Sequence, residues 1–307
     1  MLRLRRAFGL LAASALFTFQ LAVPGLAIAR TAAPEWACTP DAPSITARGG
    51  IADSRGTVRE KDTGQVVKEL PKGAAGAAPT NLTVSVPIYF HVITSGTTGS
   101  LTDRQLRGQV AQMNAAYSGS YGGPDTGFSW TFAGADRTNN ATWYASKSAG
   151  AEHAMKQALK IGGDNVLNVY TTSGGAYLGW AYLPDITDTA QAYLDGIVMD
   201  WRTVPGASSD YAGLYDEGDT LVHEAGHWLN LEHTFFGQCN KTGDFVADTP
   251  AEKSAAFGCQ VGRNTCPASG LDPIHNYMDY SDDPCLTEFT AGQAQRMRDA
   301  WLFYRAP

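Results

Sequence analysis

Two spacings of apolar residues alternate along this chain, and each spacing predicts one kind of element. Short β-branched or aromatic runs between Gly, Asn and Pro predict strands, whereas apolar positions three or four residues apart predict helices. The predicted strands cover residues 82–93, 128–132, 166–170 and 194–201. The predicted helices cover residues 102–117 and 152–160, a segment around residues 223–227, and a last segment after Thr290. The pattern therefore predicts an α+β fold with a twisted mixed sheet and helices in its N-terminal lobe.

The C-terminal part of the chain has less regular patterning. Residues 179–184 predict a loop, and residues 234–284 are rich in Gly, Cys and Asp without a clear period. Thr102 or Asp103 is expected to cap the first helix, and Thr290 the last. The apolar stripe of that last helix consists of Ala294, Met297, Trp301 and Leu302. We therefore expect an irregular C-terminal lobe that ends in a helix.

The N-terminus has the features of a secretion signal. Three arginines in the first six residues precede an apolar run over residues 10–23, Pro24, and an A-x-A sequence at residues 27–29. This order predicts a signal peptide over residues 1–29 and a secreted, extracellular protein. The apolar run is too short for a stable membrane span, so we expect no membrane contact in the mature form. The alternative is an uncleaved anchor.

Residues 30–80 differ in composition from the rest of the chain. They contain few large apolar side chains, and residues 73–79 are all Gly, Ala or Pro. This composition predicts a pro-segment that ends in a flexible linker, followed by one folded domain over residues 81–307. The alternative is an N-terminal extension without a role.

Charge and cysteine content narrow the possible partners. Of 23 basic and 30 acidic residues, 10 and 6 lie in the first 80 positions, so the remainder carries about −11. Such acidity argues against nucleic acid and anionic membranes as partners. Cys38 stands alone, and the other four cysteines are Cys239, Cys259, Cys266 and Cys285. Export permits disulfides, and four cysteines allow three pairings that spacing alone does not decide.

The most specific chemical signal is an HExxH sequence followed by a third histidine. His223 and His227 are four residues apart, so on a helix both imidazoles lie on one face and can reach one Zn²⁺. His233 requires a sharp turn, and Asn230 stands at the turning position because Asn tolerates positive φ. Three protein ligands leave one position open, as in a catalytic zinc site; the alternative is a structural or relic site. Glu224 can hold a water without binding the metal.

With Met278 downstream, the chain resembles the metzincin zinc peptidases, and within them the pappalysin family (peptidase family M43) in its secreted bacterial and fungal branch. The matching stretches are residues 86–92, 179–184, 220–235, 243–250, 276–280 and 289–297. The resemblance spans roughly residues 82–305 and implies a metzincin-like catalytic domain. One position departs from the family pattern, because Asn230 stands where relatives usually have Gly.

The resemblance implies a role for each site residue. The three histidines would bind zinc, and Glu224 would be the general base that deprotonates the metal-bound water and passes its proton to the leaving amine. Met278 would form the floor beneath the metal, and Tyr280 would hydrogen-bond the developing oxyanion. Without this context, Met278 is an ordinary core methionine and Tyr280 a packing residue.

The resemblance also implies the disulfides Cys239–Cys266 and Cys259–Cys285, which would staple the irregular lobe by about 2–4 kcal/mol each. Relatives bind Ca²⁺ near residues 243–250, where Asp244, Asp248 and Thr249 offer the oxygen ligands that this ion prefers. The alternative for these three residues is a set of side-chain turns and caps.

Cys38 has its own interpretation. If the other four cysteines pair, Cys38 is left unpaired before the linker, and relatives are made as zymogens. We hypothesise that the Cys38 thiolate takes the position of the catalytic water in the precursor, as in a cysteine switch. The alternative is a free or intermolecularly paired thiol.

Together these features predict a secreted zinc endopeptidase, made as a latent precursor and acting as a monomer on extended protein or peptide substrates. Residues 194–201 would be the edge strand that pairs with the substrate. The substrate residue after the scissile bond would meet Asp282, Asp283 or Leu286. An aspartate that points into the pocket would favour Lys or Arg at this substrate position, whereas Leu286 in the lining would favour apolar residues. The alternatives are a non-catalytic zinc-containing binding protein on the same scaffold and a different zinc hydrolase, such as a cell-wall amidase.

Overall fold

The computed structural model describes residues 58–307, apart from residues 62, 64, 66, 241 and 268–269. The predicted signal peptide and Cys38 lie outside the described residues. Within the described part of the chain, no helix is both long enough and apolar enough to cross a membrane.

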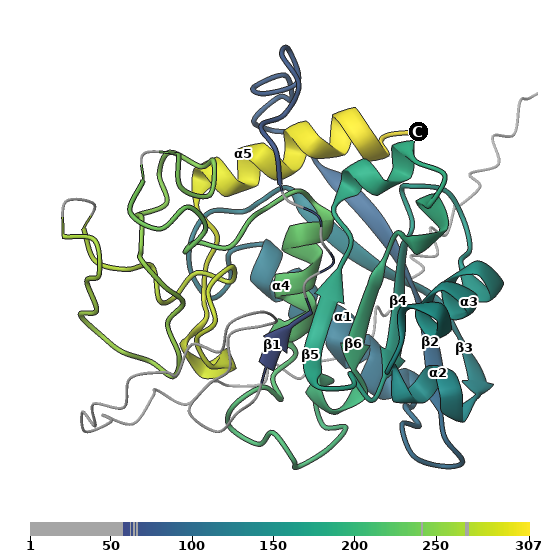
Figure 1. Cartoon of the computed structure of the whole chain (residues 1–307). Helices are drawn as coiled ribbons and strands as arrows, with labels where there is room; N and C mark the ends of the chain where they lie inside the picture. Colours follow the sequence, from purple (N-terminus) through teal and green to yellow (C-terminus); the bar gives the residue numbers. More distant parts are fainter. Residues whose placement is uncertain (1–57, 62, 64, 66, 241, 268–269) are drawn as a thin grey trace, which may run out of the picture. The chain divides into compact units, whose positions relative to one another are not determined.

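Six strands of the described chain form one mixed sheet in the order β1-β5-β6-β4-β2-β3 (Figure 1). The strands are β1 Val58–Glu60, β2 Val84–Thr94, β3 Phe128–Asn139, β4 Leu167–Thr172, β5 Tyr177–Ala181 and β6 Ile197–Asp200. β2 pairs in parallel with β3 and β4, and β4 pairs in parallel with β6. β5 runs antiparallel to β6, and β1 runs parallel to β5. The sheet confirms the predicted α+β class, with β1 and β5 running against the other four strands.

Helices pack on both faces of this sheet. They are α1 Asp103–Tyr117, α2 Ala141–Ala145, α3 Ala149–Leu159, α4 Asp219–Trp228 and α5 Ala291–Ala300. Short 3₁₀ turns lie at Pro184–Asp188, Ala192–Leu194, Trp201–Thr203 and Asp283–Cys285. On one face, Val86 and Phe90 of β2 share a buried cluster with Leu106 of α1, Trp228 of α4 and Met297 of α5. On the other face, a second cluster joins the sheet to α2 and α3.

Two helices begin as the sequence predicts. Thr102 and Thr290 each accept a hydrogen bond from the backbone N–H of the Gln three residues later, whose side chain bonds back to the threonine. These reciprocal bonds form capping boxes at the starts of α1 and α5. The prediction that Leu302 is buried is wrong, since 41% of it is exposed. The chain there enters a π-helical turn, Trp301–Arg305, which changes the rotation per residue and moves Leu302 off the buried face.

Two predictions about the sheet are wrong. Residues 179–184, predicted as a loop, begin inside β5. Residues 194–201, predicted to contain the edge strand, contain β6, which lies between β5 and β4. Leu178 to Ala181 are buried on both faces, so β5 lacks the alternation that reveals a strand, and the glycine at its centre is typical of a loop.

The segment between β1 and β2 packs against the domain that follows it. Leu70 and Ala74 are buried in a small cluster with α5. The backbone N–H groups of Gly76 and Ala78 donate to the carboxylate of Asp299 on α5, at 2.6 and 2.9 Å. The stretch that was predicted to be a linker therefore forms turns that are hydrogen-bonded to α5.

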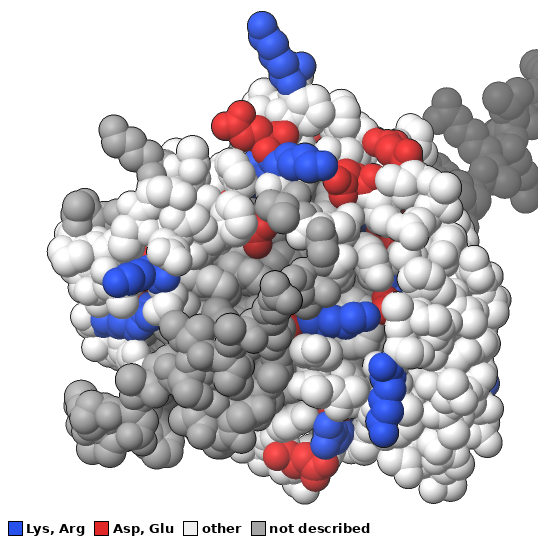
Figure 2. All heavy atoms as spheres, in the orientation of Figure 1, with Lys and Arg blue, Asp and Glu red and all other residues white. Residues whose placement is uncertain are grey.

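Charged side chains of both signs are interspersed among uncharged ones on the face drawn in Figure 2. Exposed ion pairs such as Arg137–Asp103 (2.6 Å) and Arg202–Asp210 (3.4 Å) occur on the described surface. Such pairs contribute little net stability in water. The two buried apolar clusters therefore account for most of the stabilisation of the fold.

Candidate metal centre

Helix α4 carries the HExxH sequence through the middle of the molecule. All ten of its residues are buried, between the sheet and α1. Gly218 precedes the helix with φ 95°, a conformation that glycine adopts without strain. His223 and His227 therefore project from one face of a helix that the core holds on the other sides.

A sharp turn after α4 brings in the third histidine. Asn230 has φ 73°, which confirms the predicted left-handed conformation at this position. The N–H of Leu231 donates to Gly226 O at 2.9 Å, and the guanidinium of Arg296 donates to Asn230 O at 2.8 Å. The chain reverses here, and His233 points back toward the two histidines of the helix.

The three imidazoles meet through their Nε2 atoms. His227 Nε2 lies 3.1 Å from His223 Nε2 and 3.0 Å from His233 Nε2. The Nδ1 atoms of His223 and His227 face the carbonyls of Tyr277 and Leu231 at 2.6 and 2.8 Å. A carbonyl only accepts, so the Nδ1 atoms of His223 and His227 carry protons, and their Nε2 atoms are the ones that can bind a metal at the centre.

This arrangement fits a zinc ion. Zn–N bonds of about 2.0–2.1 Å at tetrahedral angles separate two ligand nitrogens by about 3.3 Å, close to the separations observed. Lone pairs at this distance repel one another unless a proton or a cation lies between them. Carbonyl acceptors on Nδ1 are also the usual outer partners of metal-binding histidines.

Met278 packs against α4 at Gly226, between the two histidines that this helix carries. It is fully buried, and its Sδ approaches the position that a Cβ on Gly226 would occupy, so α4 and the turn pack together only because residue 226 is glycine. The backbone N–H of Met278 donates to the side chain of Asn276, which also pairs with Gln293 of α5. These bonds fix the turn that presents the Tyr277 carbonyl to His223.

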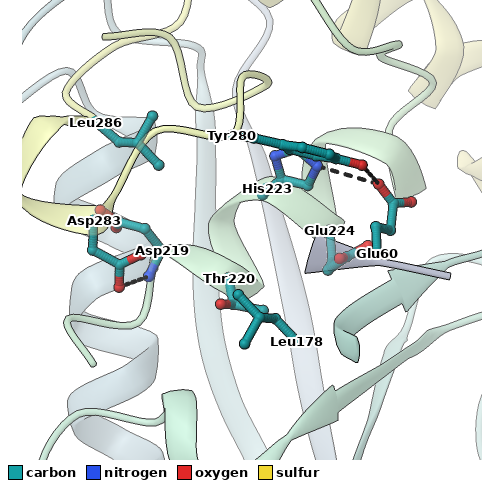
Figure 3. A pocket seen from close by; sticks show the side chains of 9 residues that line it. All are labelled: Glu60, Leu178, Asp219, Thr220, His223, Glu224, Tyr280, Asp283 and Leu286. Carbon is teal, nitrogen blue, oxygen red and sulfur yellow. Dashed lines mark hydrogen bonds and ion pairs between the residues drawn. The ribbon is translucent and has the colours of Figure 1, made fainter. Parts of the chain in front are cut away.

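Glu224 and Tyr280 lie on different sides of His223 (Figure 3). Glu224 is 1% exposed, and its carboxylate lies so close to β5 that a Cβ on Gly179 would come within 2.8 Å of Oε1. The Tyr280 ring packs against His223 and His233, with centroids 5.7 and 5.0 Å apart. The structure thus brings together all the residues to which the resemblance assigns a catalytic role.

The structure adds Glu60, for which the sequence predicts no role. Its Oε2 lies 2.6 Å from His233 Nε2, 3.3 Å from His227 Nε2 and 3.5 Å from His223 Nε2. The Tyr280 hydroxyl donates to the same oxygen at 3.3 Å. Glu60 ends a three-residue strand, too short for a periodic signal, and its contact with His233 joins residues 173 positions apart. No sequence pattern in residues 30–80 indicates this contact.

The buried charges shift one another's pKa values. Burial lowers the pKa of His223 to about 4. Burial acts in the same direction on His227, but the carboxylate of Glu60 outweighs it and raises the pKa of His227 to about 10. Burial favours the neutral form of Glu60, yet His227 and His233 hold its pKa well below 4.5. Glu60 is therefore an anion that compensates positive charge at the centre of the histidines.

A small pocket opens beside the histidines, between the start of α4 and the chain after the Met278 turn. Its lining residues are Glu60, Leu178, Asp219, Thr220, His223, Glu224, Tyr280, Asp283 and Leu286 (Figure 3). Asp283 Oδ2 accepts from the backbone N–H groups of Glu217 and Asp219 at 3.0 and 3.4 Å. Asp283 and Leu286 thus lie where the substrate-selecting residues were expected, whereas Asp282 is not in the lining.

The residues of the predicted disulfides and calcium site are not among those that line this pocket. Cys239–Cys266 and Cys259–Cys285 are bonded, the pairs that the resemblance implies. Asp248 accepts from the Thr290 hydroxyl at 2.7 Å and the Gly292 N–H at 2.9 Å, at the start of α5. Asp244 Oδ2 and Thr249 Oγ1 are buried, and the Thr249 side chain acts on the Asp244 carboxylate by lowering its pKa. Burial raises the pKa of Asp244 to about 7.

Comparison with known proteins gives consistent matches. The family model Peptidase M43, described as pregnancy-associated plasma protein-A, matches residues 207–301. A protein of Colletotrichum graminicola named extracellular metalloprotease is 44% identical over 239 residues, covering 76% of this chain and 82% of the relative. An extracellular metalloprotease of Podospora anserina is 39% identical over 304 residues, covering 94% and 98%.

Solved structures show the same similarity. Mature mirolysin of Tannerella forsythia, in complex with a cleaved peptide, has a TM-score of 0.61 and 26% identity, covering 70% of this chain and 90% of that chain. A promirolysin variant from the same organism has a TM-score of 0.63 and 24% identity, covering 74% and 83%.

Proposed function

The chain belongs to the M43 peptidase family and is an extracellular metalloendopeptidase, and we propose that His223, His227 and His233 hold its zinc ion while Glu224 acts as general base. We further propose that it is made as a precursor whose residues 30–80 keep it latent. The observation that carries the zinc proposal is the convergence of three Nε2 atoms. Backbone carbonyls hold the Nδ1 atoms of the two histidines on α4 and so orient their rings.

The metal would supply Lewis-acid chemistry, which polarises a carbonyl and lowers the pKa of water. Glu224, the residue after His223, supplies the base. Its carboxylate lies against β5, and the scissile peptide bond of a substrate paired with that strand would pass beside it. A carboxylate there can take the proton of the attacking water and deliver it to the leaving amine. Burial excludes competing bulk water from the carboxylate.

Tyr280 is suited to stabilise charge that develops during the reaction. Its hydroxyl already donates to an anionic oxygen, Glu60 Oε2, beside the three histidines. An oxyanion formed at the same place would accept the same hydrogen bond, and such preorganised donors act most strongly on charge that appears in the transition state.

The substrate would bind as an extended strand on β5. With β1 set aside, β5 is the edge of the sheet nearest the histidines, and its free backbone groups can pair with any peptide sequence. This assigns to β5 the role that the sequence assigned to residues 194–201. We propose protein or peptide substrates and a monomeric enzyme.

We also propose a structural Ca²⁺ site around Asp244, Asp248 and Thr249. Its support is that the Asp244 carboxylate and the Thr249 hydroxyl are neighbours whose Oδ2 and Oγ1 atoms are buried, so their oxygens could face one cation. Hard cations prefer such oxygen ligands. In the structure Asp248 bonds to the start of α5, so it would have to share its carboxylate between the helix and the ion.

The test compares wild type with Glu224→Ala after removal of residues 30–80, on a library of proteome-derived peptides, with zinc content measured for both. Wild type should cleave with one zinc per chain, and a chelator should abolish cleavage. Cleavage by Glu224→Ala at the wild-type rate would refute the role of Glu224. Zinc binding without cleavage by wild type would favour a non-catalytic zinc protein.

A further inference from the structure

We propose that Glu152 and Trp180 form a subsite that selects a lysine or arginine of the substrate, close to the scissile bond and on the side of the bound peptide that faces α3. This inference rests on the proposed function, because it names a substrate class for the same enzyme and requires that β1 leaves β5 in the active form.

The strand that is paired with β5 shows how a peptide meets this edge of the sheet. Glu60 lies opposite Gly179, and the N–H of Lys61 donates to the Gly179 carbonyl at 3.3 Å. Side chains of an extended chain alternate in direction. Glu60 accordingly points toward the histidines, and Lys61 points toward Glu152 of α3. A substrate strand on β5 should also present a side chain to α3, next to a residue that faces the metal centre.

Two groups meet the side chain that faces α3. The Lys61 ammonium lies 2.8 Å from Glu152 Oε2 and 4.5 Å from the centre of the Trp180 ring. A carboxylate supplies the opposite charge, and the face of an indole attracts a cation. Lys and Arg carry a positive charge at neutral pH. The pair of groups therefore favours these two side chains over neutral or acidic ones.

The protein itself orients the Glu152 carboxylate. Its Oε1 accepts from the Trp180 indole N–H at 2.8 Å and lies 3.3 Å from the Lys156 ammonium, while Oε2 is the atom that Lys61 contacts. Burial favours the neutral form of Glu152, but Lys156 and Lys61 hold its pKa below the usual value. Glu152 is thus a buried, ordered anion, so binding of a cation to it costs little additional side-chain entropy.

A second carboxylate lies further along the same edge. Asp185, in the turn that follows β5, is 3.7 Å from the Lys68 ammonium. The Gln65 side chain accepts from the N–H of Leu183 and donates to Asp185, both at 2.8 Å. The pair of Lys68 and Asp185 is exposed and contributes little energy, but the carboxylate repels acidic side chains. An extended segment on this edge therefore meets negative charge at two places.

The experiment uses the enzyme obtained by proteolytic activation of the full precursor. Cleavage of a library of proteome-derived peptides identifies the selected position. Two peptides that differ only at this position, with Lys or with norleucine, are then compared by kcat/KM, because norleucine keeps the aliphatic stem and lacks the ammonium group. Glu152→Gln is the test variant, since its amide still accepts from Trp180 but carries no charge. Asp188→Asn, an exposed acid of the neighbouring turn, is the matched control.

Wild type should prefer Lys or Arg at a position within three residues of the scissile bond. Its kcat/KM for the Lys peptide should be at least ten-fold above that for the norleucine peptide. Glu152→Gln should lower this ratio below three, and Asp188→Asn should keep it. A ratio that persists in Glu152→Gln would overturn the proposal. Equal cleavage of the two peptides by wild type would also overturn it, and would mean that Lys156 alone satisfies Glu152.

The comparison of two peptides on wild type needs no variant, so the proposal stays testable if Glu152→Gln misfolds. The ratio should then survive Asp283→Asn, which changes the pocket beside the histidines, and its loss there would assign the selection to that pocket. If wild type cleaves no peptide, the proposed function fails. Binding of the same two peptides to the activated enzyme, measured by calorimetry, would still decide the subsite, with ten-fold tighter binding of the Lys peptide expected and equal binding refuting it.

Discussion

Different kinds of bond stabilise two regions of the molecule. One region is the sheet with its helices, and the other is the irregular lobe, residues 229–290. β2 pairs with β3 along its whole length, so sheet geometry rests on many equivalent backbone hydrogen bonds. In the lobe, a single side chain connects several loop segments. Arg263 donates to the carbonyls of Ser254 and Ala255 and forms ion pairs with Glu252 and Asp272. Two disulfides add to this.

The metal centre draws on both regions. The sheet region supplies His223, Glu224 and His227 on a buried helix, and the lobe supplies His233 and Tyr280. The first set is therefore positioned redundantly, whereas the second depends on a few individual side chains. Changes that break the side-chain bonds of the lobe should disturb the site through stability, and changes to the polar side chains that α4 and the lobe present to the site should act through chemistry.

The largest effect is expected for Glu224→Gln. Loss of a positioned general base should lower kcat by about 10³–10⁴-fold, while zinc content and melting temperature stay at wild-type values, because the core holds α4. Steady-state kinetics and metal analysis of the trimmed enzyme measure this. Loss of zinc or of folding in the variant would show that the core of the sheet region does not hold α4 by itself.

Removal of Cys239–Cys266 by a double substitution to Ser should lower the free energy of unfolding by about 2–4 kcal/mol, measured in urea. The variant should lose zinc at a lower urea concentration than it loses the far-ultraviolet dichroism of the sheet region. Wild type with its disulfides intact is the control. Coincident loss of both signals in the variant would mean that the two regions unfold as one unit.

Tyr280→Phe removes a single hydroxyl from the lobe side of the site. We expect kcat to fall by about 10–100-fold with KM nearly unchanged, because the lost hydrogen bond forms mainly to the transition state. Phe235→Leu, which changes a ring packed against Tyr280, is a control for altered packing. A wild-type kcat in Tyr280→Phe would restrict the tyrosine to a packing role.

The smallest expected effect is a pH dependence of the free energy of unfolding, which comes from Asp244 in the lobe. Burial raises the pKa of Asp244 to about 7 from about 3.8, so the folded protein binds this proton more tightly than the unfolded chain. The stabilisation is fully present below about pH 4 and is lost as pH rises through 7. Asp244→Asn should therefore be more stable than wild type above pH 7, by about 1 kcal/mol, without calcium.

Calcium should affect the two proteins differently. At pH 8 it should raise the melting temperature of wild type and leave Asp244→Asn unchanged, since only the carboxylate attracts the ion. An equal response of both proteins would remove Asp244 from the proposed calcium site.

The sequence predicted the regions of the fold to different degrees. A helical pattern located α1, because this helix has one buried and one exposed face. A β-branched and aromatic run located β2, and the cap and apolar stripe after Thr290 located α5. The HExxH spacing and Asn230 predicted the convergence of the histidines, because both depend on local backbone geometry. β5 was missed because it is buried on both faces and contains Gly179.

The contact of Glu60 could not be predicted for a different reason. It joins positions 173 residues apart through a strand of three residues, and neither partner needs a special backbone conformation for it. Local rules describe how a segment folds, and they do not say which distant surface it will reach. Leu302 illustrates the same limit on a small scale, since a π turn set by neighbouring packing moved it.

The pairing of β1 with β5 is intramolecular, because the chain joins the two strands. A tethered strand meets its partner at roughly millimolar effective concentration, so even three paired residues keep this edge of the sheet occupied. If the chain were cut between β1 and β2, this effective concentration would be replaced by the bulk concentration of the released peptide, and other peptides could compete for the same edge.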